Sequence, residues 1–105
     1  MKGNQVLTEA VFYILLSLQQ PLHGYGIIQY VAELSNDRVK LAPGTLYGAL
    51  NTLLNKQWIK LVKEEHIKSK KEYLITAQGM EALKNEMARL KELVTNGEMI
   101  LMEEI

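Results

Sequence analysis

The period of the apolar residues changes along this chain, and the order of the changes limits the folds that it can adopt. Apolar residues recur at helical spacing over 8–18, 24–35 and 43–55. The stretch 58–75 is instead rich in β-branched and aromatic residues with partial alternation, which is typical of strands. From residue 80 the helical period returns. The sequence therefore predicts three short helices, a β-hairpin and one long helix.

Residues that begin and end helices support these limits. Thr8 is a typical N-cap for the first helix, and Pro21 ends it because proline disfavours a helical residue before it. Asn36 and Asp37 tolerate the left-handed conformation that closes the second helix. Pro43 suits the first position of the third helix, since its missing N–H is not needed there. We therefore expect the third helix to begin at residue 43.

The hairpin is expected to have strands over 58–63 and 71–75, joined by a polar turn over 64–69. A hairpin beside three helices makes a wing, so the predicted fold class is mainly α with a small β-hairpin. We expect a winged helix-turn-helix domain over 1–75 and a long C-terminal dimerisation helix over 76–105, in one compact unit. A chain of 105 residues is long enough for one domain only.

The last helix, which Thr76 is expected to cap, carries an apolar seam. Its apolar residues follow alternating steps of three and four, the rhythm of a helix that packs against another helix. Such a seam either covers the core of its own chain or binds a second copy. Because a seam this long would be exposed on a monomer, we predict a homodimer. The predicted interface residues are Leu83, Met87, Leu90, Val94 and Leu101. The pair Asn96–Gly97 leaves open whether the helix is continuous.

Charge is unevenly distributed, although the chain has 12 basic and 12 acidic residues and a net charge of zero. Residues 1–37 carry a net −2, residues 38–71 a net +6 and residues 72–105 a net −4. At physiological salt, charge interactions decay within about 8 Å, so the local excess matters more than the sum. The basic middle is compatible with a nucleic-acid partner and equally with a solvated face.

The outward side of the predicted third helix carries no charge. It presents small and polar residues: Gly44, Thr45, Tyr47, Gly48, Asn51, Thr52 and Asn55. A helix of this kind fits the major groove of double-stranded DNA, where an Asn51 amide can pair with adenine. Thr45 and Tyr47 can donate hydroxyls, and the N–H groups from Pro43 to Thr45 suit a phosphate. In the alternative interpretation, Gly44 and Gly48 only permit close packing within the protein.

Lysines gather at the expected tip of the wing. Lys68, Lys70 and Lys71 lie there, with Lys63 and His66 nearby. Lysine contacts with phosphates bind DNA without reading its sequence. The alternative is an ordinary solvated turn.

Several other functions are disfavoured. There is no cysteine, which excludes disulfides, thiolate zinc sites and thiol redox sensing. His23 and His66 have no carboxylate pair at ligand spacing, and no catalytic motif is recognisable, so we expect no metal, no cofactor and no enzyme activity. No apolar run approaches the roughly 20 residues of a membrane span, and the start of the chain lacks a secretory pattern. A cytoplasmic protein without a membrane partner is predicted.

Five stretches closely resemble the PadR-like transcriptional regulators, and the resemblance extends over nearly the whole chain. They are LTEAVFYILLSL (7–18), PLHGYGI (21–27), LSNDRVKLAPGTLYGALNTL (34–53), KQWI (56–59) and YLITAQGMEAL (73–83). The resemblance implies a winged-helix homodimer that represses genes from a palindromic operator and is released by a small aromatic or drug-like effector. It implies that Pro43–Asn55 is the recognition helix, that Tyr25 lies close to DNA or to the recognition helix, and that the wing lysines match the basic wing of the family.

The chain departs from the family at two points. Ala42 precedes Pro43, where a capping residue is expected, and the only tryptophan is Trp58, whereas relatives that sandwich flat drugs carry one on the last helix. The last helix offers four methionines there, which adapt to apolar ligands but more often fill cores. A winged helix that contacts only other proteins, and no DNA, is the alternative function.

Overall fold

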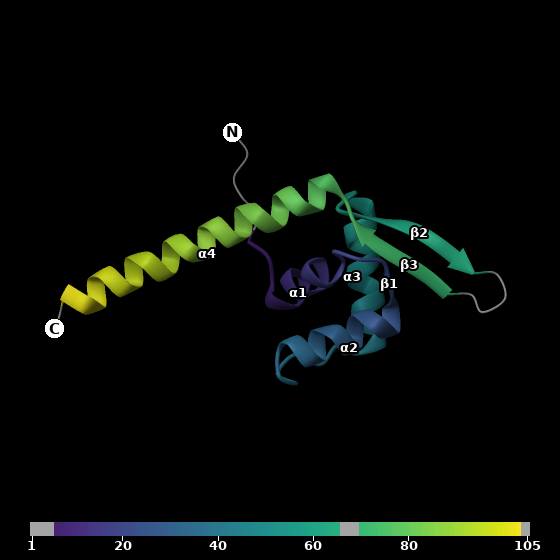
Figure 1. Cartoon of the computed structure of the whole chain (residues 1–105), viewed down its shortest axis with the longest axis horizontal. Coiled ribbons are helices and arrows are strands. Elements are labelled where there is room, and N and C mark those ends of the chain that lie inside the picture. Colours follow the sequence, from purple (N-terminus) through teal and green to yellow (C-terminus); the bar gives the residue numbers. More distant parts are fainter. Residues whose placement is uncertain (1–5, 66–69, 104–105) are drawn as a thin grey trace.

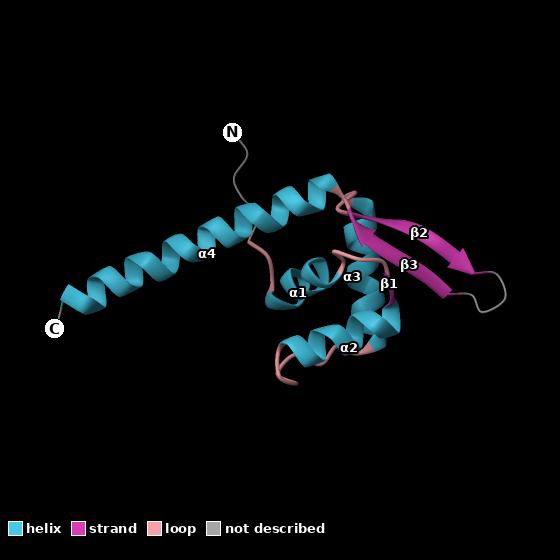
Figure 2. Cartoon of the chain, in the orientation of Figure 1, coloured by secondary structure: helices cyan, strands magenta, loops and turns pink. Residues whose placement is uncertain are grey.

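The computed structural model describes residues 6–65 and 70–103. Its helices and strands are α1 (Glu9–Ser17), β1 (Leu22–His23), α2 (Gly24–Leu34), α3 (Pro43–Asn55), β2 (Ile59–Glu65), β3 (Lys70–Ile75) and α4 (Ala77–Glu103). Three short helices form the body, the β2–β3 hairpin projects from one side, and α4 extends from the opposite side (Figures 1 and 2). The predicted fold class, a mainly α winged helix with a long C-terminal helix, is confirmed.

The sheet has one strand more than the sequence predicted. Its order is β1-β3-β2, with all pairs antiparallel, so β3 is the central strand. Leu22 of β1 and Leu61 of β2 both pair with Tyr73 of β3. A two-residue strand such as β1 is too short to show any alternation. The strand β2 also runs to Glu65, so two residues expected in the turn pair with β3 instead.

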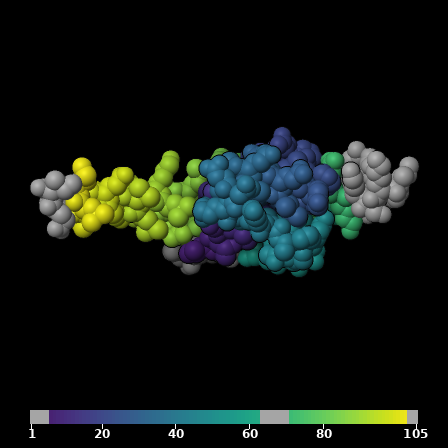
Figure 3. All heavy atoms as spheres, turned by 90° about the horizontal axis from the view of Figure 1, so that it is seen from below, coloured from purple at the N-terminus to yellow at the C-terminus, as the bar shows by residue number. Residues whose placement is uncertain are grey.

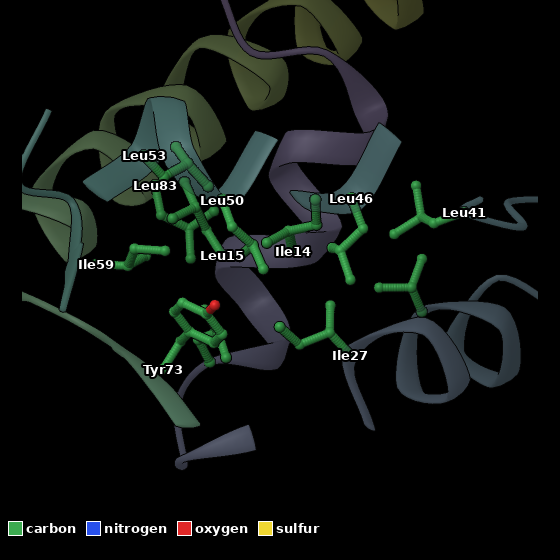
Figure 4. Close-up of a cluster of buried hydrophobic side chains, with 12 residues drawn as sticks. Ile14, Leu15, Ile27, Leu41, Leu46, Leu50, Leu53, Ile59, Tyr73 and Leu83 are labelled. Atoms are coloured by element: carbon green, nitrogen blue, oxygen red, sulfur yellow. The ribbon is translucent and has the colours of Figure 1, made fainter. Parts of the chain in front are cut away.

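The core lies between the three short helices and the inner face of the sheet (Figure 4). Its buried apolar members are Ile14, Leu15, Leu18, Ile27, Val31, Leu41, Leu46, Leu50, Leu53, Ile59, Tyr73 and Leu83. Every element except the two-residue β1 contributes at least one of them. The core therefore fixes α3 and the wing relative to one another.

The helix ends follow local chemistry. The Thr8 hydroxyl accepts the Val11 N–H at 3.1 Å and caps α1, and the Thr76 hydroxyl accepts the Gly79 N–H at 3.1 Å at the start of α4. Asn36 and Asp37 have φ of 55° and 63°, the left-handed region that ends α2. All of these ends agree with the sequence prediction.

The helix α4 changes character along its length. Its start packs closely: a Cβ at Gly79 would lie 2.1 Å from the Trp58 carbonyl oxygen, so only glycine fits there. Residues 91–102 are all exposed, and the helix is continuous through Gly97. Leu83, which the seam assigned to the dimer interface, lies instead in the core of its own chain at 3% exposure. In the described part of the chain, no helix is long and apolar enough to cross a membrane.

Candidate nucleic-acid interface

The two sides of α3 are chemically distinct. Leu46, Leu50 and Leu53 are at most 2% exposed and hold the helix on the core. The outward side is exposed over a set of uncharged residues: Pro43, Gly44, Thr45, Tyr47, Gly48, Asn51, Thr52 and Asn55. A Cβ built at Gly44 or Gly48 would meet nothing within 4 Å. The packing explanation for these two glycines is therefore wrong, and the helix presents bare backbone to the outside.

The side chain of Tyr47 crosses from α3 to the first turn of α2. A Cβ at Gly24 would lie 2.3 Å from the Tyr47 hydroxyl, so the glycine leaves the space that the phenol occupies. His23, the N-cap residue of α2, makes no side-chain capping hydrogen bond. The Tyr47 ring remains 47% exposed, and Tyr25 beside it is 67% exposed. Two tyrosines thus lie at a helix start, where backbone N–H groups are unpaired.

A hollow of about 370 Å³ lies where α2, α3 and β3 meet. Its lining residues are His23, Gly24, Tyr25, Tyr47, Asn51, Lys71 and Tyr73. Four of them, Tyr25, Tyr47, Asn51 and Lys71, are residues that the sequence singled out for DNA binding. The structure brings these four together from three elements that are distant in sequence. Seen from below, α2 and α3 lie side by side on one face of the molecule (Figure 3).

The structure describes only some of the other residues predicted for DNA binding. Thr45 is exposed in the first turn of α3, outside the hollow. Lys70 pairs with Glu65 through the backbone at the outer end of the described hairpin. Lys68 and His66 lie outside the described residues. Sequence reasoning missed the contribution of Tyr73, which is 5% exposed and also lines the hollow. The sequence placed Tyr73 in the returning strand over 71–75 and gave it no role in a site.

One base of the positive middle segment is neutralised within the protein. The Arg38 guanidinium donates to both carboxylate oxygens of Glu9, with a distance of 2.9 Å from Nη1 to Oε1. This hydrogen bonding raises the pKa of Arg38 and lowers that of Glu9. Positive charge for an external partner therefore comes from the lysines of the segment. No group of three His, Asp or Glu that could hold a metal ion occurs within residues 6–65 and 70–103.

A second surface is apolar and lies on α4. Its exposed apolar residues include Met87, Leu90, Leu93, Val94, Ile100 and Leu101. Phe12 of α1 and five residues of α4 line a shallow hollow of about 390 Å³; the α4 residues are Met87, Leu90, Lys91, Val94 and Thr95. Leu93 and Ile100 were not in the predicted seam. They widen the apolar side of the helix beyond a single line of contact.

Comparison with known proteins places this arrangement in a family. The model of the transcriptional regulator PadR-like family matches residues 12–85. An uncharacterized 37.1 kDa protein of a Streptomyces fradiae transposon is 37% identical over an alignment of 86 residues, and the match covers 78% of this chain. The chain spans about a quarter of that relative, since the match covers 24% of it.

Solved structures agree in fold. A PadR-like transcription factor from Bacteroides fragilis is 28% identical, with 87% of each chain covered and a TM-score of 0.71. Bordetella bronchiseptica BpsR, whose DNA binding is regulated by 6-hydroxynicotinic acid, is 19% identical and has a TM-score of 0.65. That match covers 87% of this chain and 64% of BpsR, and at this identity it shows the fold alone.

Proposed function

Because the chain belongs to the transcriptional regulator PadR-like family, we propose that it is a repressor that binds a palindromic operator as a homodimer and is released by a small aromatic molecule. One observation carries the DNA-binding part of the proposal. The exposed side of α3 is uncharged, bare at two glycines, and adjoins a hollow that contains hydroxyl, amide and ammonium groups. Base edges and phosphates are recognised by these groups.

In the proposed complex, α3 enters the major groove with its exposed side toward the bases. Gly44 and Gly48 allow close approach, because nothing projects from the helix at either position. Asn51 is exposed one turn further along and offers an amide that can pair with adenine. Thr45 and Tyr47 donate hydroxyls, and a groove about 12 Å wide admits the whole helix.

Phosphate contacts position the protein on the duplex. The exposed Lys71 ammonium and the two tyrosines at the start of α2 surround the hollow on the side of the wing. Lys68 and Lys70 are proposed to add further phosphate contacts by their charge. Phosphate contacts of this kind add affinity and fix the register, and the base contacts of α3 add specificity.

The second copy binds the apolar side of α4. Leu93, Val94, Ile100 and Leu101 are each more than half exposed, and large exposed apolar patches normally mark an interface. A two-fold dimer presents two copies of α3 to half-sites about one helical turn apart. The proposed operator is palindromic for that reason. A regulator of this kind acts where the chromosome is, so the proposal puts the protein in the cytoplasm.

An effector is proposed by analogy and by surface chemistry. BpsR responds to a hydroxylated aromatic acid. In this chain, the hollow between Phe12, Met87 and Leu90 is apolar and adjoins the proposed dimer surface. An aromatic molecule bound there would change how two copies of α4 meet. Trp58 is half-buried with the Lys56 ammonium 4.9 Å above its ring, which favours a packing role over drug stacking.

The test is selection of DNA by the full chain from fragments of the genome that encodes it, followed by binding measurements on the enriched sequences. We expect a shared palindrome and affinity that falls steeply with salt. Aromatic acids should then be added one at a time. At least one of them should lower the affinity of the protein for the selected DNA. Failure to retain any fragment at low salt would favour a winged helix that contacts only proteins.

A further inference from the structure

A buried carboxylate on α4 has no role in the surfaces described above. Glu86 is 1% exposed, and none of residues 87–102 is buried. Both of its oxygens accept hydrogen bonds: Arg89 donates from Nε to Oε1 at 2.8 Å and from Nη2 to Oε2 at 2.7 Å. The Leu7 N–H donates to Oε2 at 3.2 Å. Glu86 therefore joins α4 to the segment that precedes α1, and it is the last buried residue of α4 within residues 77–102.

The segment 7–9 connects three parts of the molecule. Leu7 binds α4 through Glu86, and Thr8 caps α1. Glu9 binds Arg38, which lies in the loop between α2 and α3. Contacts thus run without interruption from α4, through the start of α1, to the loop that leads into the recognition helix.

Stability alone does not account for a charge at this position. A buried ion pair is often no more stabilising than apolar residues of similar volume, because both charges lose their hydration. The Arg89 guanidinium lowers the pKa of Glu86, so the pair is ionised at neutral pH. A bidentate arginine–carboxylate pair adds defined geometry, since both groups are planar and both bonds must form together. What the pair supplies here is a fixed direction for α4.

Beyond Glu86, α4 acts as a lever. The 17 residues to Glu103 span about 26 Å at 1.5 Å per residue, so a 10° change in direction moves the far end by roughly 4–5 Å. A partner bound to α4 would move with it. Successive base pairs of DNA are only about 3.4 Å apart. A change of this size therefore corresponds to about one base pair of half-site spacing.

We propose that Glu86 is a positioning residue that holds α4 at one angle to the winged-helix body and thereby determines which operator spacing the dimer accepts. The inference rests on the proposed function, because it requires a dimer bound to two half-sites. With the hydrogen bonds of Glu86 to Arg89 and Leu7 intact, an altered half-site spacing forces strain on α4 or weakens binding at one half-site. With these bonds broken, α4 adopts other angles and several spacings bind similarly.

The experiment compares binding to synthetic duplexes that contain the palindrome selected from genomic fragments, with the spacer lengthened or shortened by one or two base pairs. The main variant is Glu86→Met, which fills a similar space but accepts none of the three hydrogen bonds. Glu86→Gln can still accept the Leu7 N–H, and Glu92→Gln is the matched control on the exposed side of the same helix. Sedimentation and thermal unfolding establish that each variant is folded and dimeric.

We expect the unmodified chain and Glu92→Gln to prefer one spacing by about tenfold or more, the equivalent of about 1.4 kcal/mol. Glu86→Met should reduce that preference to about threefold or less while leaving single half-site affinity unchanged, and Glu86→Gln should lie between. If Glu86→Met does not fold, Arg89→Met decides the matter, because its guanidinium is partly exposed. A folded, dimeric variant with the unmodified spacing profile would overturn the inference and leave the proposed function intact. Absence of any operator binding by the unmodified chain would overturn both.

Discussion

The helices α3 and α4 both present an exposed side, and the two sides are chemically opposite. On α3 the exposed residues of that side are small or polar and uncharged, whereas one side of the outer half of α4 carries exposed leucine, valine, isoleucine and methionine. A polar helix surface exchanges hydrogen bonds with water for hydrogen bonds with a partner. Binding therefore gains little free energy unless the geometry of the new bonds is precise. An apolar surface gains free energy from any complementary apolar partner. One side is therefore suited to reading a sequence and the other to association.

The largest effect is expected from a charge on the apolar side. Leu90→Lys places an ammonium in the proposed interface, at a residue that is 37% exposed and so tolerates the change within its own chain. The variant should sediment as a monomer and lose operator affinity on the order of 100-fold or more, because two linked half-site contacts become one. Glu92→Lys, on the opposite side of α4, should remain dimeric. A Leu90→Lys protein that stays dimeric at micromolar concentration would place the interface elsewhere.

A smaller effect is expected from removing a base-reading amide. Asn51→Ala should weaken operator binding by roughly tenfold to a hundredfold, the range of a good bidentate base contact. Binding to unrelated DNA should be unchanged, because the amide reads a base and not a phosphate. Asn85→Ala, an exposed amide on α4, is the matched control and should bind normally. Equal reductions in affinity for the operator and for unrelated DNA would argue against base reading by Asn51.

Removing lysines from the wing should have the same effect on binding to all DNA sequences. Replacing Lys70 and Lys71 by alanine should weaken binding to every DNA sequence. It should also reduce the slope of log affinity against log salt by about one for each phosphate that is no longer neutralised. Lys84→Ala, an exposed lysine on α4, should leave the slope unchanged. Titrations at several salt concentrations measure the slope. An unaltered slope in the double variant would mean that the wing does not contact DNA.

The smallest effect concerns acid stability. Hydrogen bonds from Arg89 lower the pKa of Glu86, and the Arg38 guanidinium lowers the pKa of Glu9. A carboxyl whose folded pKa is lowered contributes stability above its unfolded pKa of about 4.3, and the contribution is lost as pH falls through the folded value. Thermal unfolding between pH 7 and pH 3 should therefore show a smaller acid loss of Tm for Glu86→Gln than for the unmodified chain. Parallel curves would mean that the pair contributes nothing to this dependence.

Local signals in the sequence predicted most of the helices. Pro43 starts α3 and two threonines cap α1 and α4, because each acts on backbone groups within three residues. The exposed, uncharged side of α3 was predicted for the same reason: helical period alone assigns residues to opposite sides. The wing was also predicted, but the end of β2 was placed two residues too early. Pairing with β3 extends this strand beyond the residues with a strand-like sequence pattern.

Contacts between distant segments were not predicted. The strand β1 exists only because Leu22 and His23 pair with β3. Leu83 was wrongly assigned to the dimer interface, because the core of its own chain covers it. The fit of the Tyr47 hydroxyl over Gly24 also joins two helices and has no signature in either one.

The sequence by itself determined the order of the helices and of the hairpin, the family and the exposed polar side of α3, since these follow from spacing and side-chain chemistry along the chain. Only the tertiary structure decided that four DNA-binding candidates share one hollow and that Glu86 links α4 to Leu7, 79 residues away. The physical reason is that the partner of a buried polar group, or the covering of an apolar one, is set by packing in space. Residues far apart along a chain carry no local record of that packing.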